Sequence, residues 1–179
     1  KIKNYSNFSL GGDGGDETFF GYITFDAFNL ALKIKSFIPN FFLKSLSKIF
    51  NLNKISYEYI SFSTKLRKFF NSIHLDVKYL LPNWMNCLSE NDLDQLFNEK
   101  TSNDKIYEEV RDLFSNNMNL MRSSQLYYFK FYLPMVLAKV DQASMFNSVE
   151  SRSPFLSKII INFSLGHNID SLYKLSKKK

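Results

Sequence analysis

The amino-acid sequence predicts a mainly helical fold with one short strand ahead of the helices. Apolar residues recur at helical spacing through most of the chain, whereas residues 5–10 alternate weakly in polarity. Four of the six glycines follow that alternating segment, as expected where a strand ends in a loop. With 179 residues and 45% apolar content, the chain is large enough to bury one core.

The predicted elements run in order from this strand. A helix is expected from about Glu17 to Phe37, with Asp16 as its N-cap and Pro39 just beyond its end. Further helices are predicted over residues 41–50, 57–70, 75–88, 90–98, 104–115, 125–146 and 157–164.

Two prolines shape the C-terminal third of the chain. Pro134 removes a backbone N–H within the segment 125–146, so a kink or a new helix start is expected there. Pro154 disfavours the α conformation at Ser153, so residues 150–155 should be extended.

Charge and composition exclude several classes of protein. The net charge is +6, and part of the excess comes from the lysines of residues 174–179. Because the sequence has no RNA-binding motif of aromatic and basic residues, these lysines predict a solvated surface and not a nucleic-acid site. No apolar run reaches the roughly 18 residues that span a bilayer. The single Cys87 excludes an internal disulfide, and His74 and His167 lack zinc-ligand spacing. These features predict a cytoplasmic protein.

Residues 41–50 and 57–70 have the pattern of basic amphipathic helices. Their apolar stripes predict helix sides that face a core. The alternative is that they lie on a membrane surface, which predicts liposome binding that weakens with salt.

The most informative segment is Gly11–Thr18, in which three acids are interleaved with four glycines. Glycines let a ligand approach the main chain, and N–H groups at a following helix start favour anions. The carboxylates of Asp13, Asp16 and Glu17 would repel a bare phosphate, a conflict that a bridging Mg²⁺ resolves. The segment therefore predicts a loop that holds a Mg-bound polyphosphate, and the alternative is an ordinary tight turn before a helix.

Generic phosphate-binding templates do not describe this loop. No Lys-Ser/Thr pair follows the glycines, so it is not a Walker A motif, and Glu17 stands where the dinucleotide fingerprint needs its last glycine. The spacing of an EF-hand is also missing.

Residues 133–145 form a second candidate segment. On a helix its apolar residues share one face, with Asp141 on the flank, where a carboxylate needs a partner or a ligand. Lys139 points roughly the other way and should not pair with Asp141. Asp141 therefore either serves a site or holds a helix junction together.

Residues 150–156 form a third candidate segment. If the segment is extended, Glu150 and Arg152 project to the same side. A carboxylate and a guanidinium aimed together can read a charged substrate, or they can form a structural ion pair that anchors the loop.

Together the three segments resemble the synthetase domain of glutamine-dependent asparagine synthetases. That family has a Ser-Gly-Asp/Glu-Gly-Gly/Ser-Asp-Glu loop followed by Leu/Val-Phe-Gly-Gly-Tyr, and residues 11–22 follow this pattern. Its Tyr-Leu-Pro, Lys-Val-Asp-Arg-Ala-Ser-Met and Glu-x-Arg-x-Pro-Phe-Leu-Asp motifs are matched at residues 132–134, 139–145 and 150–157. The resemblance is specific over residues 9–22 and 126–157 and loose across 23–125.

The resemblance implies the C-terminal part of an α/β adenine-nucleotide α-hydrolase-like (ATP pyrophosphatase) synthetase domain. It implies a ligase that uses ATP and Mg²⁺ to adenylate aspartate and forms asparagine with ammonia from glutamine. By motif position, Gly11 and Gly12 contact ATP, and Asp13 is the catalytic acid. Asp16 and Glu17 face the Mg-pyrophosphate, with Asp16 reaching the metal through it. The residues implied as supports of the site are Lys139, Asp141, Glu150 and Arg152.

Four departures from the family pattern leave the acceptor acid open. Gly11 replaces a serine, Phe20 a glycine, Gln142 an arginine and Ser157 an aspartate. One alternative is an amidotransferase for another acid in surface-polysaccharide synthesis. An alternative from another class is a degenerate, non-catalytic helical domain that binds a partner.

Two family features are missing from the sequence. These are the Ser-Gly-Gly-x-Asp-Ser pyrophosphate loop and the N-terminal cysteine of the glutaminase domain. We therefore expect residues 1–179 to be a partial synthetase domain, inactive alone, whose partners are aspartate, ammonia or glutamine and the glutaminase domain. No nucleic acid and no membrane span are expected, and a homodimer is compatible with the sequence.

Overall fold

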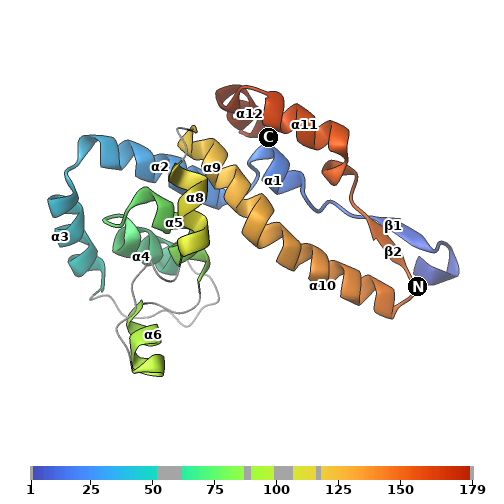
Figure 1. Ribbon diagram of the computed structural model, residues 1–179, viewed down its shortest axis with the longest axis horizontal. Coiled ribbons are helices and arrows are strands. Elements are labelled where there is room, and N and C mark those ends of the chain that lie inside the picture. Colours follow the sequence, from blue (N-terminus) through green and yellow to red (C-terminus); the bar gives the residue numbers. More distant parts are fainter. Residues whose placement is uncertain (1, 52–61, 87–89, 99–106, 116–117, 178–179) are drawn as a thin grey trace. The chain divides into compact units, whose positions relative to one another are not determined.

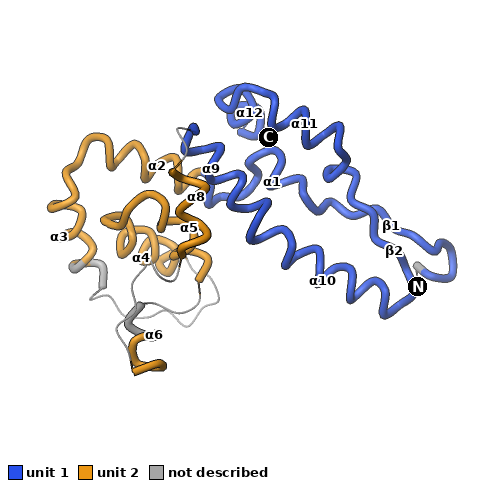
Figure 2. Tube along the Cα trace, viewed as in Figure 1, with its two compact units in different colours: residues 1–25, 118–179 blue, residues 26–117 orange. Residues whose placement is uncertain are grey.

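Figure 1 shows the computed structural model, which describes residues 2–51, 62–86, 90–98, 107–115 and 118–177. Its contacts divide the chain into two compact units, coloured separately in Figure 2. Unit 1 comprises residues 1–25 and 118–179, and unit 2 comprises residues 26–117. The described residues are mostly helical with one short parallel sheet, which confirms the predicted fold class.

The sheet of unit 1 pairs β1 (Phe8–Leu10) with β2 (Glu150–Arg152) in parallel. Phe8 lies opposite Glu150, and Leu10 lies opposite Arg152. The strand predicted over residues 5–10 is thus confirmed for its last three residues, and a short 3-10 turn, η1 (Ile2–Asn4), precedes it. The pairing brings two of the three candidate segments together from opposite ends of the chain.

The first predicted helix is two helices in the structure. α1 (Gly15–Phe19) and α2 (Ile23–Phe37) are separated at Phe20, whose backbone is left-handed with φ 57°. That conformation costs about 1–2 kcal/mol for a residue other than glycine. Burial of the Phe20 ring, which lies edge-on to Phe25 and Tyr173, offsets this cost. The prediction of one continuous helix is wrong for this reason.

The predicted N-cap, Asp16, is also wrong. Gly14 occupies that position, with φ 83° and ψ −10°, and Asp16 lies in the first turn of α1. Glycine adopts this left-handed conformation without steric cost, so the turn needs no side-chain cap. The carboxylate of Asp16 therefore has no capping role.

A broken helix forms the long spine of unit 1. α9 (Leu120–Tyr127) passes into a π-helix, η2 (Tyr128–Tyr132), and then into α10 (Leu133–Phe146). Pro134 lies in the first turn of α10, which confirms the predicted new helix start.

The C-terminal part of unit 1 follows β2. It consists of a 3-10 turn, η3 (Pro154–Leu156), and the helices α11 (Lys158–Gly166) and α12 (Ile169–Ser176). The extended prediction over 150–155 is confirmed as far as Ser153, and η3 begins at the proline. α12 is not among the helices predicted from the sequence, although its N-cap is local: the Asn168 side chain accepts from the Ser171 N–H at 3.2 Å.

Unit 2 contains most of α2 and several further helices. Those described are α3 (Asn40–Asn51), α4 (Phe62–Ser72), α5 (Val77–Met85), α6 (Glu90–Phe97) and α8 (Glu108–Ser115). They confirm the helices predicted here, while residues 57–61, 87–88 and 104–106 of those predictions lie outside the described residues.

The interior of unit 2 is mainly apolar. Its buried apolar side chains include Phe28, Ala31, Leu43, Phe69, Ile73, Leu80, Leu81 and Val110. Lys35 of α2 ties that helix to the turn after α4, because its Nζ donates to the carbonyl oxygens of Ile73 (3.0 Å) and Leu75 (2.7 Å). Burial lowers the pKa of Lys35.

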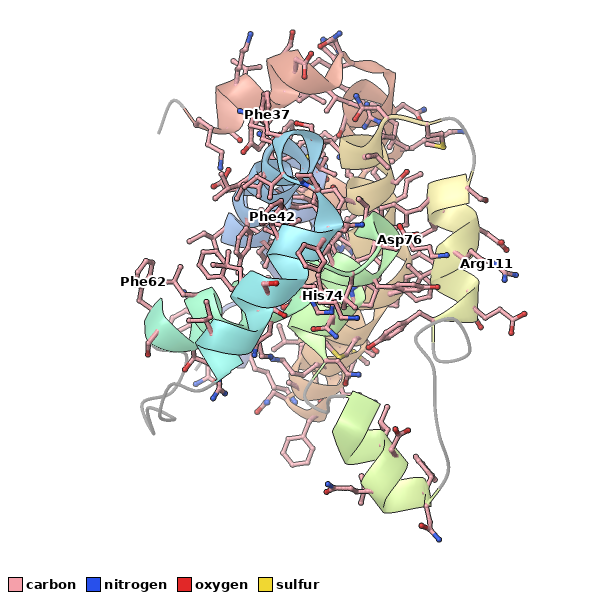
Figure 3. All side chains as sticks on the ribbon, turned by 90° about the vertical axis from the view of Figure 1, so that its left-hand side faces the viewer. Phe37, Phe42, Phe62, His74, Asp76 and Arg111 are labelled. Atoms are coloured by element: carbon pink, nitrogen blue, oxygen red, sulfur yellow. The ribbon has the colours of Figure 1, made fainter. Side chains whose placement is uncertain are left out.

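The two amphipathic helices α3 and α4 bury one side each, as predicted. Leu43 of α3 and Phe69 of α4 lie in the core. Phe42 and Phe62 of the same helices remain exposed, and Figure 3 shows their side chains at the surface. Among the described helices, none has the length and apolar character needed to cross a membrane.

Candidate functional site

The glycine–acid loop connects β1 to α1, and β2 fixes its start. The Gly11 N–H donates to the Arg152 carbonyl at 2.8 Å, and the Glu150 N–H donates to the Asn7 carbonyl at 2.8 Å. These bonds extend the parallel ladder by one residue beyond β1. The first and third candidate segments are therefore neighbours in the fold.

A tight turn closes the loop. The Gly15 N–H donates to the Gly12 carbonyl at 3.2 Å, and the angles of Gly14 are those that a type II turn needs at its third residue. A Cβ at Gly14 would overlap the side chain of Leu156 and lie 2.6 Å from its Cγ. Glycine is thus required here twice, by the backbone and by the packing of η3 against the turn.

The three acids of the loop have different surroundings. Asp16 is exposed and Asp13 is half-buried, and neither side chain has a bonding partner among the described residues. Glu17 is only 1% exposed, and its Oε1 accepts a hydrogen bond from the Tyr22 hydroxyl at 3.0 Å. The loop presents two carboxylates, whereas the structure places the predicted pyrophosphate-facing Glu17 in the interior of unit 1.

The backbone donors of the loop also differ. Within the described part of the chain, the N–H groups of Gly12, Asp13 and Gly14 have no acceptor. The N–H of Gly11 is already bonded to the sheet. Of the two predicted ATP contacts, Gly12 therefore retains a donor that a phosphate oxygen could use, and Gly11 does not.

Side chains from α9 and α11 hold the C-terminal end of α1. Gln125 is fully buried, and its Nε2 donates to the carbonyl oxygens of Glu17 (3.0 Å) and Thr18 (2.9 Å). The Ser164 hydroxyl donates to the Thr18 carbonyl at 2.6 Å, and Arg122 donates to Oε1 of Gln125. A helix leaves its last carbonyl groups without intrahelical partners, so this cluster supplies them.

The guanidinium of Arg122 also donates hydrogen bonds to two backbone carbonyl oxygens. Its Nη1 donates to the Ser164 carbonyl at 3.1 Å and its Nη2 to the His167 carbonyl at 2.9 Å. Burial lowers the pKa of Arg122. This cluster is not among the features predicted from the sequence. The Arg-Ser-Ser-Gln run of residues 122–125 beside an apolar stretch is a signal for it, because buried polar side chains need partners.

Tyrosines pack behind Glu17. Tyr22 stacks on Tyr128 of η2 with ring centroids 5.0 Å apart, and the hydroxyls of Tyr128 and Thr24 are hydrogen-bonded. Burial raises the pKa of Tyr128 to about 12, although the bond to Thr24 opposes the shift. Burial, together with the carboxylate of Glu17, raises the pKa of Tyr22 as well. Both phenols are neutral at physiological pH, and Tyr22 donates to Glu17.

Glu150 and Arg152 form a two-bond ion pair on the exposed side of β2. Nε of Arg152 donates to Oε1 of Glu150 at 3.0 Å, and Nη2 donates to Oε2 at 3.2 Å. These bonds hold the pKa of the Glu150 carboxyl below its usual range. The guanidinium also lies over the ring of Phe8 in the neighbouring strand. The predicted projection to one side is confirmed, and the contact of Arg152 with Phe8 joins the two strands.

The remaining predicted supports lie on α10, which contacts β2. The side chains of Lys139 and Asp141 are exposed, and in the described parts of the chain no hydrogen bond or ion pair joins either of them to the loop. The structure brings their helix to the sheet without placing these two side chains at the glycines.

The donor set of the loop suits a hard cation that arrives with a phosphate. Across the described residues, no group of three or more His, Cys, Asp and Glu side chains could hold a metal. Mg²⁺ usually takes only one or two carboxylates, with phosphate oxygens and water completing its shell. The unpaired carboxylates of Asp13 and Asp16 fit that requirement, and the nearby N–H groups fit the phosphate.

Comparison with protein families gives one result for the whole chain. The family described as asparagine synthase matches residues 1–179. Neither the curated proteins nor the solved structures contain a match to this sequence.

Proposed function

The chain belongs to the asparagine synthase family, and from that premise we propose that it forms part of the nucleotide site of an amidotransferase that makes asparagine. Membership in this family supports the assignment of the chain to an ATP-dependent synthetase domain of the ligase type. In the proposed reaction the side-chain carboxylate of aspartate attacks the α-phosphate of ATP and releases pyrophosphate. Ammonia from glutamine then attacks the acyl-adenylate and displaces AMP, which leaves the amide. The observation that carries the proposal is a loop with two unpaired carboxylates, Asp13 and Asp16, beside unused backbone donors.

Each part of the loop has a proposed task. Asp16 would hold the phosphates through their bound Mg²⁺, and the N–H groups of Gly12 and Asp13 would donate to phosphate oxygens. When bound, Mg²⁺ neutralises charge on those oxygens and favours the departure of pyrophosphate. The carboxylate of Asp13 orients the reacting groups, as its motif position implies.

The remaining residues act through the loop. The ion pair with Glu150 orients the Arg152 guanidinium over the Phe8 ring, a contact that helps to keep β2 beside β1. The Arg152 carbonyl oxygen holds Gly11. Glu17, bonded to Tyr22 inside unit 1, fixes α1 instead of reaching the metal. We propose supporting roles for Lys139 and Asp141 on the ground of their motif alone.

The test uses the complete protein, with Mg-ATP binding measured by calorimetry and aspartate-dependent pyrophosphate release measured by a coupled assay. Asp16→Ala should weaken Mg-ATP binding by at least about tenfold, as loss of a metal-site partner does. Asp13→Ala should lower pyrophosphate release more than it lowers Mg-ATP affinity. Asp170→Ala, at an exposed acid of α12 in the same unit, is the matched control and should change neither.

Three outcomes would count against the proposal. They are a complete protein that binds no Mg-ATP, an Asp16→Ala variant that binds it normally, and an equal loss in Asp170→Ala. Pyrophosphate release that depends on a different carboxylic acid would retain the adenylation and replace aspartate as the acceptor.

A further inference from the structure

We propose that Gly21 is a positioning residue, whose lack of a side chain makes room for the carboxylate of Asp16. A Cβ built on Gly21 would overlap Oδ1 of Asp16 and would lie 2.8 Å from its Cγ. The carboxylate therefore rests against the bare Cα of Gly21. This inference rests on the proposed function, because it concerns the carboxylate that we assign to the Mg-bound phosphates.

The end of α1 brings Gly21 back to Asp16. The N–H groups of Phe20 and Gly21 both point to the Asp16 carbonyl, with the Gly21 bond at 2.9 Å. The left-handed backbone at Phe20 makes this reversal possible. The turn that follows the helix thus hydrogen-bonds the backbone carbonyl of Asp16, and the side chain of Asp16 lies against the same turn.

Space, and not backbone conformation, is what requires glycine at this position. Among the described residues, Gly14 is the one glycine with a positive φ, so an L-residue could adopt the backbone of Gly21. The residue in the turn that does have a left-handed backbone is Phe20. Glycine stands one position after the place where the backbone would favour it, at the place where the carboxylate lies.

A similar but looser relation is found at the other acid of the loop. A Cβ on Gly11 would lie 2.8 Å from Oδ2 of Asp13. Each of the two unpaired carboxylates therefore lies against a glycine, whereas the buried Glu17 does not. The pairing of glycines with these two carboxylates supports a role in placing them.

An alanine at position 21 would move the carboxylate more than it would disturb the fold. The overlapping atoms belong to the end of the Asp16 side chain, which can rotate away, and the nearest backbone atom, Cα of Asp16, would lie 3.1 Å from the new methyl group. The rotated carboxylate would no longer be presented in its place on the loop. The effect on ligand binding should exceed the effect on stability.

The test measures Mg-ATP binding by the complete protein with Gly21→Ala, Asp16→Ala and both substitutions. Gly21→Ala should raise the dissociation constant at least about tenfold. In the Asp16→Ala background the same substitution should change it less than about twofold, because the carboxylate it displaces is gone. Gly166→Ala is the matched control, since a Cβ there meets no atom within 4 Å, and it should leave the dissociation constant unchanged.

Thermal unfolding without nucleotide gives a second readout that does not depend on the proposed function. Gly21→Ala should lower the Tm of the protein that has Asp16 more than that of the Asp16→Ala protein. Equal Tm shifts in both backgrounds, or an unchanged Mg-ATP affinity of Gly21→Ala, would overturn the inference. If the unsubstituted protein binds no Mg-ATP, the proposed function fails, and the Tm comparison alone decides the role of Gly21.

Discussion

Unit 1 buries a network of polar side chains around the end of α1, whereas unit 2 buries mainly apolar ones. In unit 1, Gln125 and Ser164 have no exposed surface and bond to carbonyl oxygens of α1. In the described part of unit 2, the buried polar side chains are Ser47 and Ser72. An apolar interior accepts several packings of similar energy, whereas a satisfied hydrogen-bond network specifies one. This polar network contacts the end of α1, the helix that follows the loop for which we propose ligand binding.

The buried ionisable groups of the two units also differ in the direction of their pKa shifts. Unit 1 keeps the phenols of Tyr22 and Tyr128 neutral by burial. In unit 2, burial lowers the pKa values of Lys35 and His74. Through these groups, unit 1 is expected to lose stability as the pH rises above 10, and unit 2 as the pH falls below the ordinary pKa values of 10.5 for Lys35 and 6.5 for His74.

Gln125→Leu tests the comparison most strongly. The substitution keeps the volume but leaves the Glu17 carbonyl without its partner. It also removes one of the two hydrogen bonds to the Thr18 carbonyl and the bond from Arg122 to Oε1 of Gln125. With roughly 1–3 kcal/mol for the unsatisfied Glu17 carbonyl and about 1 kcal/mol for each further hydrogen bond that is lost, the free energy of unfolding should fall by about 3 kcal/mol. Urea unfolding followed by circular dichroism measures it.

Gln142→Leu, the same change at an exposed position of α10, is the control and should stay within about 0.5 kcal/mol of the unsubstituted protein. If Gln125→Leu proved as mild as this control, the interior of unit 1 would not depend on its polar network, and the contrast between the units would be lost.

Alkaline unfolding should be governed by unit 1. The folded pKa of Tyr128 is about 12 against an ordinary value of 10, so its contribution is fully present below pH 10 and is lost as the pH rises toward 12. A two-unit shift corresponds to about 3 kcal/mol of stability across this window. Tyr128→Phe should flatten the decline in unfolding free energy between pH 10 and pH 12.

Tyr5→Phe removes a phenol that is 91% exposed and should leave that decline unchanged. An identical slope for Tyr128→Phe and the unsubstituted protein would show that the buried phenol does not cause it.

Acid sensitivity is the smallest expected effect and belongs to unit 2. Burial, followed by the charges of Lys44 and Lys35, lowers the pKa of His74, and its Nδ1 has no partner in the described part of the chain. The unfolded chain therefore takes up a proton first as the pH falls below 6.5, and stability is lost from there downward. His74→Asn should reduce the slope of unfolding free energy against pH below 6.5.

The surface histidine of unit 1 provides the comparison for that experiment. His167→Asn should keep the acid slope of the unsubstituted protein. If the acid slope were lost in His167→Asn and kept in His74→Asn, the acid sensitivity would belong to unit 1, and this part of the comparison would be reversed.

Local patterns in the sequence predicted the elements whose cause is local. Pro134 marks the start of α10 because a proline lacks an N–H, and Glu150 and Arg152 meet because side chains two apart on a strand share a side. The glycine–acid loop was recognisable for the same reason. The break at Phe20 was not, because its left-handed backbone is stabilised by rings that pack on it in the fold.

The sequence by itself determined which family the chain resembles and where the glycine–acid loop lies. Only the tertiary structure decided that Glu17 points inward, that Gln125 closes the end of α1, and that Gly21 leaves space for Asp16. The first kind of information is written in spacing along the chain. The second depends on which side chain contacts which backbone group after the chain has packed. The pattern of residues along the chain does not record those contacts.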